Sequence, residues 1–292
     1  MYYVVYGFLY LLSLLPLRVL FLLSDVAFVV LYYLVGYRKK VVLSNLAIAF
    51  PEKTEADRKG IARRFYRNFT DNFIETIKLL SASPAFINRH CTSDYSVFEK
   101  LHQQGKKCQV HLGHTFNWEM GNLAVASNVP QKMLTVYMPI ENKVFERLFL
   151  KLRSATGAAL LPATKIRSAI LPWRNTPYLL ALVSDQSPAE PRNAYWVTYF
   201  NRPTAFLRAP ENGARVGNLP VVFCFITKKK RGYYELLFDL VEEDPAMLPK
   251  GELTKKYAAS LEKFIRQHPD TYLWSHRRWK LAWKEEYGPV IS

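Results

Sequence analysis

The residues best suited to chemistry lie in one short passage, His111 to Asn122, which reads HLGHTFNWEMGN. It follows an apolar run typical of a strand and precedes a helical pattern, so its polar side chains gather at the end of a strand, where open α/β sheets bind ligands. His114 lies in the predicted loop, and Glu119 lies in the first helical turn. From there Glu119 can reach one ring nitrogen of His114 and fix its tautomer, which leaves the other nitrogen free to accept a proton. A histidine held in this way can act as a general base toward a hydroxyl that attacks a carbonyl group.

Two other interpretations of this passage stay open on spacing alone. His114 can simply cap the loop while Glu119 interacts with the helix dipole. His111, His114 and Glu119 can also be three metal ligands, although the passage lacks the HExxH spacing and no cysteine supports a metal site. The chain has no GxSxG, Walker or GxGxxG pattern, which argues against an α/β-hydrolase, a P-loop enzyme and a dinucleotide-binding enzyme.

The segments around this passage alternate between short apolar runs and helical patterns. Strands are predicted at 108–112, 133–137, 158–161 and 178–183, and helices at 54–80, 118–126, 142–156, 164–171 and 253–267. Two further runs, 220–227 and 233–240, flank the basic stretch Lys228 to Gly232 and predict a hairpin. This alternation predicts an α/β fold with a central, mostly parallel or mixed sheet that helices cover on both faces.

The N-terminal segment is apolar and is predicted to anchor the chain in a membrane. It has no charged residue from Met1 to Leu17. A membrane span needs about 20 apolar residues. Residues 2–23 reach this length only if the span tolerates Arg18 near one of its ends. In that case 24–36 forms a second, interfacial helix. The start lacks the basic n-region and cleavage site of a signal peptide, and a buried core helix is the remaining alternative. We predict an anchor at 1–40 and one α/β domain at 41–292, which the basic residues at 38–40 place on the cytoplasmic side.

The composition of the 292 residues narrows the class of partner. The net charge of +16 implies a negatively charged partner, which can be nucleic acid, an anionic membrane, or an acidic protein or substrate. Because the basic residues are scattered and follow a membrane segment, nucleic-acid binding is disfavoured. Three isolated cysteines exclude a disulfide framework and suit a reducing compartment.

Six stretches occur in an order that resembles the lipid A biosynthesis late acyltransferases (lauroyl/myristoyl acyltransferases), a branch of the lysophospholipid/glycerolipid acyltransferase superfamily. They are Asn45-Leu46-Ala47 with Phe50-Pro51, the H-x4-E motif from His114 to Glu119, Arg153 to Gly157 with Leu161-Pro162, Asp185-Gln186, Tyr199-Phe200-Asn201 with Thr204-Ala205, and Trp274 to Trp279. Asn201 stands where the family usually has glycine. The resemblance extends from the anchor to Trp279.

The resemblance implies an enzyme at the cytoplasmic face of the inner membrane of Gram-negative bacteria. It implies transfer of a fatty acyl chain from acyl carrier protein to a hydroxyl of a lipid A precursor, with His114 as general base, Glu119 as the residue that orients it, and neither metal nor other cofactor. Residues expected to bind substrate or to support the oxyanion are Asn117, Arg153, Asp185, Arg147 and Lys165. The expected partners are acyl carrier protein, the lipid A precursor and anionic membrane lipids, and not nucleic acid.

Other functions stay open. The same chemistry can act on a glycolipid, an aminolipid or a lysophospholipid, or can use coenzyme A as the donor. A non-catalytic membrane protein is a more distant alternative. The sequence gives neither the acyl chain length nor the acceptor hydroxyl.

Overall fold

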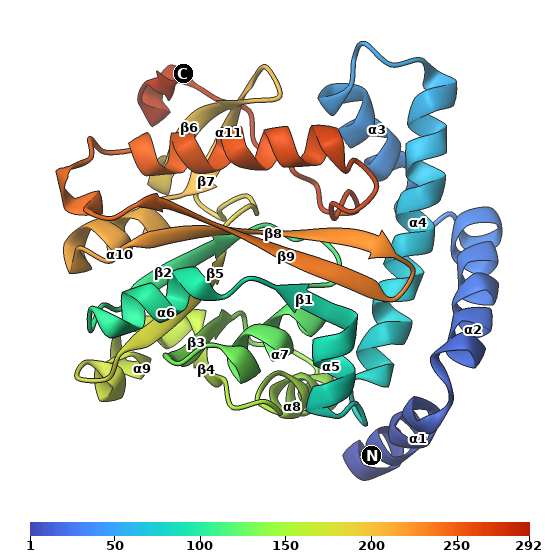
Figure 1. Cartoon of the computed structure of the whole chain (residues 1–292). Helices are drawn as coiled ribbons and strands as arrows, with labels where there is room; N and C mark the ends of the chain where they lie inside the picture. The colour runs from blue at the N-terminus through green and yellow to red at the C-terminus, as the bar shows by residue number, and fades with distance from the viewer.

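A seven-stranded sheet forms the centre of the computed structural model, which describes all 292 residues (Figure 1). The strand order is β1-β9-β8-β2-β5-β3-β4, and all neighbours are parallel except β8 and β9, which form an antiparallel hairpin. The strands are β1 (Cys91–Ser93), β2 (Cys108–Leu112), β3 (Lys132–Tyr137), β4 (Ala159–Pro162), β5 (Tyr178–Val183), β8 (Val221–Lys230) and β9 (Tyr233–Glu242). The predicted α/β fold with a mostly parallel central sheet is therefore confirmed, and β2 and β5 have the predicted bounds.

Helices cover both faces of this sheet, because alternate side chains of its strands are apolar on each side. Val222 and Cys224 of β8 join a core with α5, α6, α7 and α8, whereas Val221 and Phe223 join a second core with α3, α4 and α11. The helices are α3 (Lys39–Ala49), α4 (Glu55–Lys78), α5 (Pro84–His90), α6 (Ser96–Gln103), α7 (Trp118–Asn128), α8 (Lys143–Arg153), α9 (Ile166–Ala169), α10 (Ala209–Gly217) and α11 (Glu252–Gln267).

A small second sheet was not predicted from the sequence. It has the order β10-β6-β7 and packs on the same side of the central sheet as α11 (Figure 1). Its strands are β6 (Ala194–Tyr199), β7 (Arg202–Leu207) and β10 (Val290–Ile291). The turn between β6 and β7 puts Phe200 and Asn201 at positive φ, 50° and 57°. Asparagine tolerates this left-handed conformation better than most residues, so Asn201 suits the position where the family usually has glycine.

The N-terminal segment differs from the prediction. The prediction of a continuous helix over 2–23 is wrong, because the helix is interrupted at Pro16. Proline has no backbone N–H and restricts the backbone of the residue before it. α1 (Tyr2–Leu14) is only about 20 Å long. α2 (Leu17–Val29) continues into the π-helical turn η1 (Val30–Val35), so 24–36 is not a separate helix. The helix Leu17–Val35, with a mean hydropathy of 2.0, is long and apolar enough to be an anchor. The division into an anchor at 1–40 and a domain at 41–292 stays a prediction.

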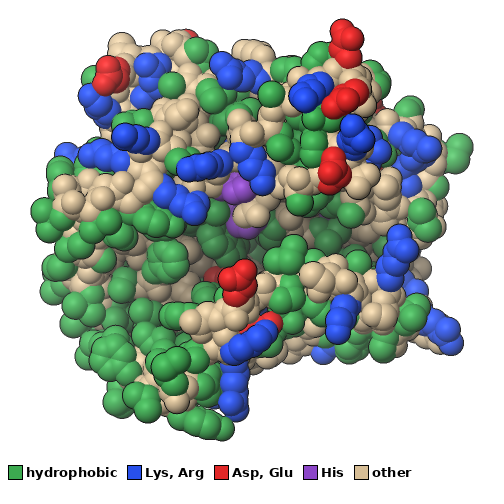
Figure 2. Space-filling model, turned by 180° about the vertical axis from the view of Figure 1, so that it is seen from behind, with side chains coloured by type: hydrophobic (Ala, Val, Ile, Leu, Met, Phe, Trp, Pro, Cys, Tyr) green, Lys and Arg blue, Asp and Glu red, His purple; other side chains and the backbone are tan.

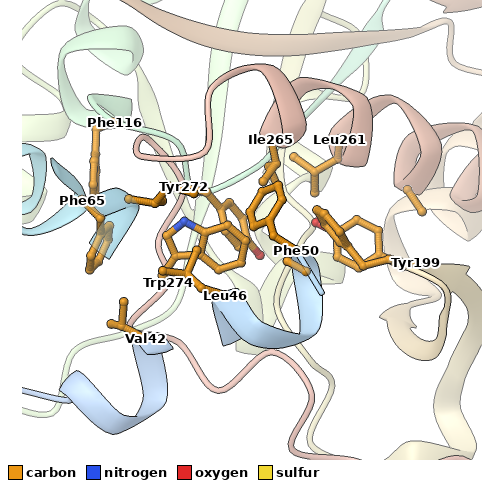
Figure 3. Packing of buried hydrophobic residues seen from close by; sticks show 14 of the residues in the cluster. Val42, Leu46, Phe50, Phe65, Phe116, Tyr199, Leu261, Ile265, Tyr272 and Trp274 are labelled. Carbon is orange, nitrogen blue, oxygen red and sulfur yellow. The ribbon is translucent and has the colours of Figure 1, made fainter. Parts of the chain in front are cut away.

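Two of the six family-like stretches, far apart in the sequence, pack against each other. Figure 3 shows Trp274 of the C-terminal stretch beside Leu46 of α3 and Phe50. The side-chain amide of Asn45 donates hydrogen bonds to the carbonyl oxygens of Trp274 and His276, at 2.8 and 2.7 Å. The stretch that follows the anchor therefore holds the C-terminal stretch in place.

Candidate active site

The carboxyl ends of β2 and β5 place a histidine beside an aspartate. The two strands are parallel neighbours, and Leu112 at the end of β2 pairs with Val183 at the end of β5. The chain therefore leaves both strands at the same edge of the sheet, with His114 two residues after one strand and Asp185 two residues after the other. His114 Nδ1 lies 2.6 Å from Asp185 Oδ1. The carboxylate that orients His114 is that of Asp185.

The prediction that Glu119 makes this contact is wrong. Glu119 lies in the first turn of α7, where it accepts hydrogen bonds from Arg153 Nη2 at 2.6 Å and Arg153 Nε at 2.9 Å. The indole N–H of Trp118 also donates to Glu119, at 3.0 Å. A guanidinium offers a carboxylate two parallel charge-assisted hydrogen bonds, which a neutral imidazole cannot match. The H-x4-E motif thus supplies one member to each of two separate pairs.

The environment of Asp185 keeps its carboxylate ionised. Burial raises the pKa of Asp185, but the charge and hydrogen bonds of His114 and the guanidinium of Arg278 outweigh it, so its pKa lies below the ordinary value. An ionised Asp185 accepts the Nδ1–H of His114, which leaves Nε2 with a free lone pair. The side-chain nitrogen of Gln186 lies 3.2 Å from His114 Nε2, where it can donate to that lone pair. This is the tautomer that a general base requires.

The loop that carries His114 is fixed by the C-terminal half of the chain. The backbone N–H of Leu273 donates to the carbonyl oxygen of His114 at 3.0 Å, and the hydroxyl of Tyr257 on α11 donates to the carbonyl oxygen of Leu112 at 2.8 Å. A Cβ atom at Gly113 would lie 2.8 Å from the side chain of Leu261, so only glycine lets α11 approach this closely. The position of His114 therefore depends on contacts with residues more than 140 positions away.

A cavity of about 1050 Å³ opens beside both pairs. Most of its lining is hydrophobic, and its polar lining includes His114, Glu119, Arg153, Gln186 and Arg167. Figure 2 shows histidine side chains in a groove on this face, with Lys and Arg gathered along one side of it and hydrophobic side chains within it. The volume is at the upper end of the range for small-molecule sites, about 300–1,000 Å³. An apolar cavity with a few polar groups at one place suits a ligand with a long apolar chain and one reactive polar group.

Three of the residues predicted to bind substrate lie elsewhere. Asn117 is fully buried as the N-cap of α7, where its oxygen accepts from Met120 N–H and its nitrogen donates to Glu75. It is not part of the cavity lining, so it does not reach an oxyanion there. Arg147 lies over the rings of Tyr2 and Tyr3 on α1, outside the cavity lining. Lys165 is exposed and also lies outside the lining, whereas its neighbour Arg167 is part of it.

His111 does not reach the reactive edge. It is buried within β2, where its Nε2 lies 2.8 Å from the side-chain amide of Gln109, and burial lowers its pKa to about 3. The metal-ligand alternative built on His111, His114 and Glu119 has no support in the structure.

Sequence reasoning missed three groups that surround the two pairs. His276 has its Nε2 3.5 Å from the backbone nitrogen of Ser187, and burial lowers its pKa to about 4. Arg278 is almost fully buried and donates to the carbonyl oxygen of Ala205 at 2.9 Å, while its Nε and one Nη have no partner. Both residues lie in the family-like stretch from Trp274 to Trp279, but the sequence did not predict that either lies beside Asp185.

The third missed group is Glu75 on α4. It is almost fully buried and accepts hydrogen bonds from Tyr234 Oη at 2.6 Å and Asn117 Nδ2 at 2.9 Å, while its other carboxylate oxygen has no partner. Burial raises the pKa of Glu75 to about 7. No local pattern predicts this burial, because a glutamate within a helix is rarely fully buried. Through Asn117 it supports the first turn of α7, which carries Glu119.

Comparison with known proteins agrees with this architecture. No curated protein matches the chain closely enough to count as a relative. Residues 1–281 match the family model described as bacterial lipid A biosynthesis acyltransferase, which covers the anchor, the sheet, both carboxylate pairs and the C-terminal stretch. The chain therefore belongs to the bacterial lipid A biosynthesis acyltransferase family.

Proposed function

We propose that this chain transfers a fatty acyl group from a thioester on acyl carrier protein to a hydroxyl of a lipid A precursor, at the cytoplasmic face of the inner membrane. Acyltransferase activity in lipid A biosynthesis follows from the family. The donor, the chemistry of the acceptor and the roles of the residues are our proposal. The observation that carries it is the pair His114–Asp185, with the second ring nitrogen of the histidine, which Gln186 contacts, at an apolar cavity.

The proposed step needs one base. His114 Nε2 takes the proton of the acceptor hydroxyl while the hydroxyl oxygen attacks the thioester carbonyl carbon. The carbon–sulfur bond of the tetrahedral intermediate then breaks, the ester remains on the acceptor, and the proton passes from His114 to the departing thiolate. Asp185 stabilises the imidazolium that exists between these events. General-base catalysis of this kind is worth roughly 10²–10⁴-fold in rate.

The second pair supplies positive charge next to the base. Glu119 occupies Nε and Nη2 of Arg153, and Arg153 Nη1 makes no hydrogen bond within the protein. We assign Nη1 to the oxyanion of the intermediate or to a phosphate of the acceptor, since a guanidinium serves either. Glu119 is then a positioning residue that acts through Arg153.

Basic residues near the site suit both proposed substrates. Arg167 lines the cavity, and Arg277 and Lys280 are exposed beside His276. Acyl carrier protein is acidic and lipid A precursors carry phosphates, so cations along the groove favour binding of either.

The test is mass spectrometry of whole lipid extracts from a strain that lacks this protein, complemented with wild type, His114→Ala or His102→Ala. His102 is an exposed histidine on α6, remote from the cavity lining, and serves as the matched control. We expect lipid A to lose one acyl chain in the deletion strain, and wild type and His102→Ala but not His114→Ala to restore it. Unchanged lipid A would contradict the acceptor, and a different lipid that changes would identify another one. Restoration by His114→Ala would contradict the proposed base.

The donor needs its own measurement. We expect purified enzyme to use acyl-acyl carrier protein in preference to acyl-coenzyme A of the same chain length. Equal kcat/KM for the two donors would contradict a role of the basic groove in recognising the carrier protein.

A further inference from the structure

The N-terminal helices bury their serines and expose many of their apolar residues. Ser13 on α1 and Ser24 on α2 are fully buried, whereas Leu22 and Val26 on α2 are 66% and 63% exposed. The buried face of α2 and η1 recurs every four residues at Leu20, Ser24, Phe28 and Tyr32. A water-facing surface has the opposite arrangement. The exposed face is therefore built for an apolar environment, and its buried face is built for the catalytic body.

Ionic contacts fix the buried face of these helices to the body. Ser24 Oγ donates to Asp71 Oδ1 on α4 at 2.7 Å. Arg231, at the tip of the β8–β9 hairpin, bridges Asp71 and Asp25 at 2.7 and 2.8 Å. Lys228 adds a contact to Asp71 at 3.2 Å. Arg231 and Lys228 of the basic hairpin therefore hold α2 against the body, Arg231 directly and both of them through Asp71.

α1 is fixed in the same way at its two ends. Lys78 Nζ donates to the carbonyl oxygens of Ser13 and Leu15, at 2.8 and 3.1 Å, and so satisfies the end of the helix. At the other end, Arg147 and Lys151 on α8 lie over the rings of Tyr2 and Tyr6, at 4.2 and 4.0 Å from the ring centres.

These contacts are incompatible with α2 crossing a bilayer. α2 lies alongside α4 (Figure 1), and the exposed Arg67 of α4 lies over the ring of Phe28 on α2, at 5.1 Å from the ring centre. If α2 spanned the membrane while packed in this way, this arginine would enter the hydrocarbon, where charges are strongly disfavoured. Asp25 and Arg231 would lie there too.

We propose that α1, α2 and η1 lie in the plane of one leaflet of an anionic membrane and do not cross it. Hydrophobic side chains gather at the edge of the molecule where α1 and α2 lie, at the left and lower left of the view from behind (Figure 2). The cations Arg18, Arg38 and Lys40 flank this face and suit anionic headgroups. The partner is a lipid surface, because the face is apolar and has a cationic rim.

This arrangement links the membrane to the site. α8 contacts α1 through Arg147 and Lys151, and Arg153 at the end of α8 is paired with Glu119 at the cavity. The bilayer surface and the cavity are therefore held at a fixed relation, so that a lipid acceptor can enter without leaving the membrane. The placement of the helices does not depend on the proposed chemistry.

A disulfide cross-link tests the docking in the full-length, membrane-bound protein. Ser24 Oγ and Thr70 Oγ1 are 3.1 Å apart, so Ser24→Cys with Thr70→Cys brings two thiols within bonding reach. The control pair is Val26→Cys with Thr70→Cys, because Val26 points away from α4. We expect a cross-link in the first pair and none in the second after mild oxidation of intact membranes. Absence of a cross-link in the first pair, or equal cross-linking of both, would overturn the docked arrangement.

Sidedness tests the in-plane placement without any change to the helices. Cleavable tags are placed ahead of Met1 and after Ser292, and protease is added to right-side-out or inverted membrane vesicles. We expect both tags to be cut only from the side that carries the catalytic body. Cleavage of the two tags from opposite sides would show a span and overturn the proposal.

Binding to vesicles tests the identity of the partner. We expect the purified enzyme to bind vesicles of phosphatidylethanolamine with phosphatidylglycerol, and Leu22→Glu with Val26→Glu to weaken this binding at least tenfold. Vesicle binding that these changes leave unaltered, or a face covered instead by self-association into dimers, would contradict a lipid partner.

Discussion

Two carboxylate pairs face the cavity, and they differ in what the partner can do. Asp185 holds His114, and Glu119 holds Arg153. In both pairs the carboxylate is almost fully buried, whereas the partner keeps 19% and 20% of its side chain exposed. An imidazole can accept a proton from a hydroxyl and pass it on, whereas a guanidinium stays charged. The same geometry thus presents a base at one place and a fixed positive charge at the other.

This difference between the pairs predicts that Asp185→Asn causes the largest loss of kcat. Without the carboxylate, the imidazolium of His114 is no longer stabilised and the tautomer is no longer fixed, so we expect kcat to fall by roughly 10²–10⁴-fold. Steady-state kinetics with a purified acyl donor would measure this. Asp239→Asn is the control, since Asp239 is an exposed aspartate of β9. A loss of less than tenfold, with an unchanged melting temperature, would remove Asp185 from the mechanism.

A smaller effect on the chemical step is expected for Glu119→Gln. The change leaves Arg153 without its bidentate partner, and breaking a buried ion pair costs roughly 3–5 kcal/mol of stability. We expect a value near the lower figure, because Arg153 keeps contact with solvent. Chemical denaturation would measure this, and kinetics should show a rise in KM that exceeds the fall in kcat. A loss of kcat as large as that of Asp185→Asn, without a change in stability or KM, would contradict a positioning role for Glu119.

The smallest effect concerns Glu75, which lies behind both pairs and supports Asn117. Its pKa of about 7 in the folded chain exceeds its ordinary value of 4.5. Between these two values the folded state binds the proton that the unfolded state has released, so the contribution of Glu75 to stability is fully present below pH 4.5 and is lost as the pH rises through 7. A shift of this size corresponds to about 3 kcal/mol.

Glu75→Gln removes this titration, so we expect its unfolding free energy to vary less than that of wild type between pH 5 and 7.5. Denaturant unfolding at several pH values would test this. Glu252→Gln, which changes a glutamate in the first turn of α11 outside this cluster, is the control. Parallel pH dependence of wild type and Glu75→Gln would show that Glu75 titrates normally.

The sequence predicted the sheet and the strand ends well, because these depend on local patterns. Apolar runs marked β2 and β5 without error, and the helix predicted at 54–80 is α4, at Glu55–Lys78. His114 and Asp185 were both predicted from the sequence to be site residues. Their pairing was not predicted, because it depends on the register of two strands about 70 residues apart.

The errors share this cause. Glu119 was assigned to His114 from sequence spacing, whereas Arg153, 34 residues away, competes for the carboxylate in space. Asn117 was assigned to an oxyanion because it lies within the motif, yet its amide is used to begin a helix and to bind Glu75. Hydropathy identified the N-terminal helices but not the face that packs on α4. The burial of Ser24 depends on its hydrogen bond to Asp71, which is distant in the sequence.

The pH dependence of kcat/KM tests most directly the claim that the two pairs have different roles. The fall in kcat/KM at the acidic side of this profile, its acid limb, reports protonation of the catalytic base in the free enzyme. We predict that Asp185→Asn moves this limb to lower pH by about one unit or more, because the imidazolium of His114 loses the carboxylate that stabilises it. Glu119→Gln should leave the limb where it is in wild type. A limb that moves in Glu119→Gln and stays unchanged in Asp185→Asn would contradict the assignment of Asp185 to the base and of Glu119 to Arg153.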